Sequence, residues 1–165
     1  MYLWRKLTAS SDQSQLACRK QVGQSLFPQG RSFHFAFTDA AGTVLGRQDV
    51  TAAFTHGRDT ETIQVDRVPA GATSVSRKER LHFLRRRVAL AGTDPDFTAD
   101  FTGPGMLLGG DYNDDNFVEV CDFAQFLRDF SRVDRPESDI NGDGTVNILD
   151  FNYIASHYFW PGDPE

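Results

Sequence analysis

The sequence predicts an α+β protein of two domains, an N-terminal antiparallel β-sandwich followed by a small all-α domain made of two loop–helix repeats. Three observations lead to this fold class. Short stretches of alternating apolar residues run from residue 31 to residue 104. A glycine-rich segment at 103–110 then ends that pattern. Two similar acidic segments, each followed by apolar residues at helical spacing, make up a second domain at 105–165.

The composition limits the classes of function. A chain of 165 residues with 39% hydrophobic residues can hold one ordinary domain or two small ones. Its charge is uneven, with 14 Lys and Arg against 10 Asp and Glu in residues 1–109, but 3 against 13 in residues 110–165. The overall charge of −6 argues against nucleic-acid binding, which normally needs a basic surface. No stretch reaches the roughly 18 consecutive apolar residues of a membrane span, so we expect no membrane-spanning segment.

Residues 1–30 show no sustained periodicity and are rich in Ser, Gln and Gly, so we expect a loosely ordered leader. They lack the roughly 7 to 15 consecutive apolar residues of a secretory signal. The two cysteines, Cys18 and Cys121, match no metal or redox spacing. Either a disulfide or two unrelated buried thiols would be consistent with this arrangement.

Residues 31–104 have the pattern of strands with one buried face. Phe33, Phe35 and Phe37 alternate with other residues, and further short apolar stretches follow between turn sequences such as DAAG and PAGA. Five or more such strands without a helical stretch favour a small antiparallel sandwich. The segment 68–88, VPAGATSVSRKERLHFLRRRV, resembles the end of a carboxypeptidase-regulatory-like or prealbumin-like sandwich. That resemblance implies a spacer or adhesion role and no chemistry.

The same part of the chain carries a run of basic residues. Its members are Arg77, Lys78, Arg80, Arg85, Arg86 and Arg87. The favoured interpretation is a solvated sheet edge, because charged residues on edge strands suppress aggregation. A patch that binds polysaccharide or phosphate, and docking against the acidic tail, remain alternatives.

The two acidic segments align residue for residue. They read DYNDDNFVEVCD from Asp111 and DINGDGTVNILD from Asp139, 28 residues later. Calcium takes six to eight oxygen ligands, and a 12-residue loop supplies them from positions 1, 3, 5, 7, 9 and 12, with a main-chain carbonyl at position 7. The predicted ligands of two Ca²⁺ ions are Asp111, Asn113, Asp115, Phe117, Glu119 and Asp122, and Asp139, Asn141, Asp143, Thr145, Asn147 and Asp150. An Asp- and Asn-rich turn without a metal is the alternative.

Position 6 of such a loop needs a positive φ, which Gly144 tolerates fully and Asn116 tolerates better than most other residues. Each loop leads into a predicted helix with one apolar face. The apolar positions are Val120, Phe123, Phe126, Leu127 and Phe130, and Ile148, Phe151, Ile154, Ala155 and Tyr158. The residues before each loop are poor helix formers, so each repeat is expected to be one loop and one helix.

Two such loops, each followed by a single helix, resemble a dockerin module over about the last third of the chain. The resemblance implies a non-catalytic module that folds on calcium and binds a cohesin-like partner. In the best-known dockerins, hydroxyl residues at loop positions 10 and 11 and basic residues of the helix contact the partner. The corresponding residues here are Val120, Cys121, Ile148, Leu149 and Arg128. Their apolar character fits either a divergent partner or a place in the core.

No catalytic motif is present. The four histidines, His34, His56, His82 and His157, show no metal-ligand pairing, and no Ser or Cys has a nucleophile context. We therefore expect a non-enzymatic, monomeric, calcium-dependent binding or attachment protein located outside the cell or at its surface. The alternatives are a purely structural calcium-stabilised end of a surface protein, and the tail of a secreted hydrolase that acts on polysaccharide.

Overall fold

The computed structural model describes residues 16–20, 31–52, 61–79, 81–94, 96–101 and 108–165. Within these ranges lie seven strands and two helices. They are β1 (Leu16–Lys20), β2 (Arg31–Thr38), β3 (Val44–Ala52), β4 (Glu61–Val65), β5 (Ser74–Glu79), β6 (Arg86–Thr93), β7 (Asp96–Ala99), α1 (Val120–Asp129) and α2 (Ile148–His157).

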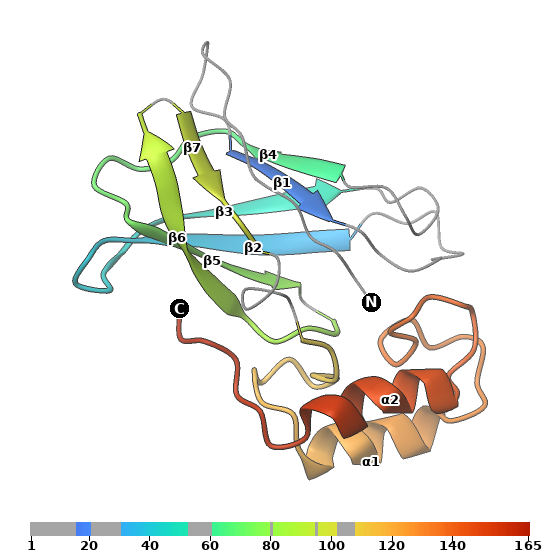
Figure 1. Cartoon of the computed structure of the whole chain (residues 1–165). Helices are drawn as coiled ribbons and strands as arrows, with labels where there is room; N and C mark the ends of the chain where they lie inside the picture. Colours follow the sequence, from blue (N-terminus) through green and yellow to red (C-terminus); the bar gives the residue numbers. More distant parts are fainter. Residues whose placement is uncertain (1–15, 21–30, 53–60, 80, 95, 102–107) are drawn as a thin grey trace.

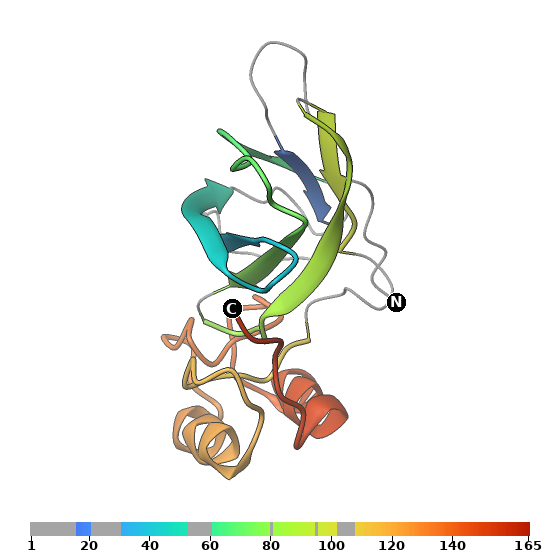
Figure 2. The same cartoon turned by 90° about the vertical axis from the view of Figure 1, so that its left-hand side faces the viewer.

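Five of the strands form one antiparallel sheet in the order β3-β2-β5-β6-β7, and β1 and β4 form a separate antiparallel pair. The large sheet curls strongly, as half of a barrel does (Figures 1 and 2). The pair lies across the open side of the curl, with β1 next to β7 and β4 next to β3. The two helices lie side by side below one end of the sheet (Figure 1).

The interior of the curled sheet is built on the alternation that the sequence shows in β2. Phe33, Phe35 and Phe37 are buried in one core cluster with Val75 and Phe101. Cross-strand register places Phe35 opposite Arg77, so the guanidinium of Arg77 also lies inside. It lies 5.2 Å from the ring centre of Phe33 and 4.7 Å from that of Phe101. Arg77 therefore packs in the core by cation–π contact, although the sequence suggests a solvated residue.

The predicted fold class is wrong on both domains. The β part is a single curled sheet with a two-stranded pair rather than a sandwich, and the helices do not form a separate all-α domain. Leu84, from the loop between β5 and β6, is fully buried in the same core as residues of α1 and α2. Among the described residues, the buried members of that core are Leu84, Leu108, Tyr112, Val118, Phe126, Ile140, Val146 and Ile154. Two short helices enclose little core by themselves, and Leu84 of the β5–β6 loop adds a buried apolar side chain to it.

Main-chain hydrogen bonds join the two parts as well. The amide of Leu84 donates to the carbonyl of Leu108 at 2.8 Å, and the amide of Gly110 donates to the carbonyl of His82 at 2.9 Å. Phe83 and Gly109 form an isolated antiparallel bridge. The chain thus continues from the sheet into the first acidic loop through a paired segment.

The end of the chain returns to the sheet (Figure 1). The amide of Asp163 donates to the carbonyl of Arg85 at 2.8 Å, and its carboxylate accepts from the amide of Arg87 at 2.7 Å. Arg86 lies 3.7 Å from the same carboxylate, and Arg47 forms an exposed ion pair with Glu165. The basic run therefore contacts the acidic tail instead of forming a solvated edge; Arg80 lies outside the described residues.

Of the predicted leader at residues 1–30, only 16–20 are described, as β1; the rest lies outside the described residues. Cys121 is an exposed free thiol. No helix in the described part of the chain is long and apolar enough to span a bilayer.

Candidate metal centre

The two predicted calcium loops, here named loop 1 (111–122) and loop 2 (139–150), have the same backbone path. Positions 4, 6 and 21 of each repeat have positive φ. These residues are Asp114 (66°), Asn116 (70°) and Ser131 (66°) in the first repeat, and Gly142 (71°), Gly144 (94°) and Phe159 (65°) in the second. Non-glycine residues rarely adopt such angles, so their recurrence at matching positions shows a structural duplication. The left-handed conformation predicted for Asn116 and Gly144 is confirmed.

Matching main-chain hydrogen bonds join the two repeats. Val118, at position 8 of loop 1, donates to the carbonyl of Trp160 at 3.0 Å and accepts from Phe159 at 2.8 Å. Val146, at position 8 of loop 2, donates to the carbonyl of Arg132 at 2.9 Å and accepts from Ser131 at 2.8 Å. Each loop is thus fixed by the residues that follow the other repeat's helix. This reciprocity holds the two loops in a symmetric pair.

Position 12 of each loop closes the loop onto the following helix. The carboxylate of Asp122 accepts from the amides of Tyr112 and Glu119, both at 2.7 Å. The carboxylate of Asp150 accepts from the amides of Asn141 at 3.1 Å and Asn147 at 2.9 Å. Both helices begin with a capping box between positions 9 and 12. The helices predicted after each loop are confirmed, and position 12 fixes where each one begins.

Position 1 differs between the loops. In loop 2, one oxygen of Asp139 accepts from the amides of Gly142 at 2.8 Å and Asp143 at 3.2 Å, and the other accepts from Gly144 at 2.9 Å. The loop's own main chain therefore satisfies both oxygens of this carboxylate.

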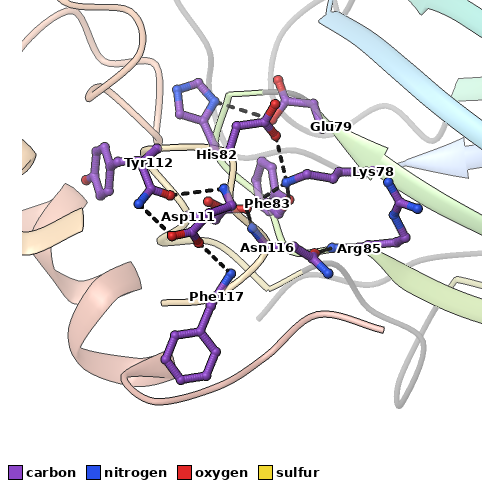
Figure 3. Close-up of polar contacts among 12 residues, drawn as sticks. Lys78, Glu79, His82, Phe83, Arg85, Asp111, Tyr112, Asn116 and Phe117 are labelled. Carbon is purple, nitrogen blue, oxygen red and sulfur yellow. Dashed lines mark hydrogen bonds and ion pairs between the residues drawn. The ribbon is translucent and has the colours of Figure 1, made fainter. Parts of the chain in front are cut away.

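In loop 1, Oδ2 of Asp111 accepts from the amide of Asn116 at 3.1 Å and from Nζ of Lys78 at 2.6 Å (Figure 3). Oδ1 of Asp111 is buried and has no hydrogen-bond partner. Loop 1 thus holds a buried carboxylate oxygen that a cation could bind.

Burial governs the charge state of these carboxylates. It raises the pKa of Asp111, Asp122 and Asp150 above the ordinary aspartate value, and hydrogen bonds to Lys78 or to loop amides only partly oppose it. At Asp143 burial also acts upward, but hydrogen bonds from Asn141 and Asn147 outweigh it, so the pKa is lowered. Buried carboxylates crowded in a loop are a donor set that a divalent cation stabilises.

The remaining predicted ligands lie around the same loops. At position 3, Asn113 and Asn141 donate to the position 5 carboxylates of Asp115 and Asp143, at 2.7 and 2.9 Å. At position 7, the amides of Phe117 and Thr145 donate to the same carboxylates, each at 2.9 Å. At position 9, the side-chain amide of Asn147 donates to the carboxylate of Asp143 at 3.1 Å, and Glu119 is the N-cap of α1.

The side chains of each loop are therefore gathered but bonded to one another. Among the described residues, no three His, Cys, Asp or Glu side chains converge as a ready metal cluster. Amide and main-chain oxygens would have to supply part of each coordination shell, as they do in calcium loops. The donor set fits a hard cation that prefers oxygen, and the open oxygen of Asp111 supports this fit.

No family model, curated protein or solved structure matches this chain.

The predicted partner-binding residues lie on the surface and do not join the core. Val120, Ile148 and Leu149 are more than half exposed, and Cys121 and Arg128 are also exposed. Their role in binding stays a prediction. Sequence reasoning placed Asp114 inside loop 1 but did not find Lys78 as its partner, since Lys78 lies 33 positions before Asp111. The sequence feature that pointed to Lys78 was the opposite charge of the two halves of the chain, which left docking of the basic run against the acidic tail as an alternative.

Proposed function

We propose that this chain is a non-catalytic, calcium-organised attachment module of the extracellular space, with a dockerin-like pair of loops at its C-terminal end. The observation that carries the proposal is the duplication: two loops share the same positive-φ positions and bury the carboxylates of positions 1 and 12. Burying carboxylates in two short loops is unfavourable, and hydrogen bonds from Lys78 and from loop amides oppose only part of that cost at Asp111, Asp122 and Asp150. A calcium ion in each loop would offset more of it.

The attachment part of the proposal rests on exposed apolar side chains. Positions 10 and 11 begin each helix next to the metal loop, and three of the four residues there are aliphatic and exposed: Val120, Ile148 and Leu149. Exposed apolar residues held in fixed positions support contact with a protein partner. Because these residues adjoin position 12, calcium bound in the loop would fix the position of their side chains relative to a partner.

A binding experiment tests this function. The tagged chain is incubated with a panel of cohesin-like domains, in calcium and in EDTA, and complexes are measured by surface plasmon resonance. We expect binding in calcium, none in EDTA, and a loss of at least about tenfold in affinity for Ile148→Asp with Leu149→Asp. Leu45→Asp is the matched control, because Leu45 is also exposed but lies on β3. Equal binding with and without calcium would count against the proposal.

A structural role for the same calcium is the second candidate, and the contacts between tail and sheet favour it. Lys78, Leu84 and Arg87 all join the sheet to the tail. In this case calcium would stiffen the end of a larger surface protein without a dedicated partner. Calcium-dependent folding together with no binding to any cohesin-like domain would favour it.

A further inference from the structure

A lysine from the sheet enters loop 1. Lys78 lies on β5 and is only 6% exposed. Its Nζ lies 2.6 Å from Asp111 Oδ2, at position 1, and 2.8 Å from Asp114 Oδ1, at position 4. It also donates to the carbonyl of Phe83 at 3.2 Å. The two carboxylate contacts hold the ammonium group against loop 1. Figure 3 shows Lys78 beside Asp111 and Phe83.

Loop 2 is built differently at the same positions. Position 4 is Gly142, which carries no charge, and the position 1 carboxylate of Asp139 is satisfied by loop amides. None of the ion pairs found among the described residues involves a loop 2 carboxylate. The duplication is therefore symmetric in its backbone and asymmetric in its charge.

We propose that Lys78 is a cation which the chain itself supplies to loop 1, so that the two loops bind calcium unequally. This inference rests on the calcium binding in the proposed function. Loop 2, with no cation of its own, takes the first ion tightly. Loop 1 takes the second ion more weakly, because that ion binds beside an ammonium group that is already there. In the absence of calcium, Lys78 holds loop 1 closed and docked on the sheet.

The unpaired oxygen of Asp111 gives the direction of the effect. Lys78 and the amide of Asn116 both bond to Oδ2, whereas Oδ1 is buried without a partner. One ligand position thus remains for a metal ion, and that ion would share the carboxylate with the ammonium group. Two positive charges a few ångströms apart in a poorly hydrated site repel each other strongly. The lysine therefore lowers the affinity of loop 1 without filling it.

Isothermal titration calorimetry with calcium on the full chain tests the inference. We expect two binding steps in the wild type that differ by at least about tenfold in affinity. Asp150→Ala should remove the tight step and Asp122→Ala the weak one, which assigns the steps to the loops. Lys78→Gln should tighten the weak step by about tenfold or more, because it removes the competing charge. Lys78→Arg is the matched control, and it should keep the two affinities apart.

Circular dichroism in EDTA adds a second readout. Lys78→Gln should lose helicity in EDTA and regain it in calcium, because its loop 1 has no other cation. Two binding steps of equal affinity in the wild type would overturn the inference. A Lys78→Gln variant whose loop 1 affinity is unchanged or weaker would also overturn it. So would a Lys78→Gln variant that stays unfolded in calcium. The absence of any calcium binding would instead refute the proposed function.

Discussion

Leu84→Ala tests whether the sheet and the helical tail form one folded unit. Leu84 belongs to the loop between β5 and β6, but its side chain is fully buried among residues of the tail. Truncation removes three buried carbon atoms and leaves a cavity, which costs about 2–5 kcal/mol in free energy of unfolding. In a chain of this size, a loss of about 3 kcal/mol lowers the melting temperature by about 6–12 °C.

The measurement is urea unfolding, followed in parallel by far-UV circular dichroism and by hydrogen exchange of amides in β5 and α1. We expect protection to fall in both elements, because Leu84 belongs to the core that joins them. Leu81→Ala is the matched control; it lies three positions earlier, is 43% exposed, and should cost less than about 0.5 kcal/mol. A loss below about 1 kcal/mol for Leu84→Ala, or a loss confined to the helices, would refute the single-unit account.

Three further predictions follow from single features of the tail. Gly144→Ala should destabilise the chain by about 1–2 kcal/mol in thermal melts, since φ is +94° and the added Cβ meets no atom within 4 Å, so the cost is backbone strain alone. Asp163→Ala should cost about 0.5–1.5 kcal/mol in urea unfolding, because the amide of Arg87 loses its acceptor. Glu165→Ala should cost less, because its ion pair with Arg47 is exposed. In EDTA, the stability that Asp111, Asp122 and Asp150 contribute should fall as the pH rises above the ordinary aspartate pKa, because burial raises the pKa of these three carboxyls and their contribution is lost as the pH rises through the raised values. Thermal melts at a series of pH values upward from the ordinary aspartate pKa measure this, and a contribution that instead grew with pH would contradict the buried state of these carboxylates.

The loops could be predicted from sequence because their geometry depends on local residue types. Asn116 and Gly144 have the positive φ that position 6 requires, and both helices begin at position 10 after the capping box of the loop. Each of these features involves residues within about one turn of each other. The pattern of residue types therefore contains the necessary information.

The sheet could not be predicted at the same level, because it depends on which distant strands pair. Arg77 appears solvated in the sequence, since it belongs to a basic run. In the fold, pairing of β2 with β5 places it opposite Phe35, inside the curl. Leu84 and Lys78 were missed as parts of the tail for the same reason. Their partners lie more than 20 positions away, and the spacing of apolar residues does not report such contacts.

Thermal unfolding of the full chain in about 1 mM calcium and in excess EDTA tests most directly whether calcium organises the tail. A ligand present at about a hundred times its Kd adds about 2.7 kcal/mol to stability, so we expect the melting temperature to rise by at least about 5 °C. Asp139→Ala combined with Asp150→Ala should remove most of that rise, and magnesium should not reproduce it. Identical melting curves in calcium and EDTA would contradict the account.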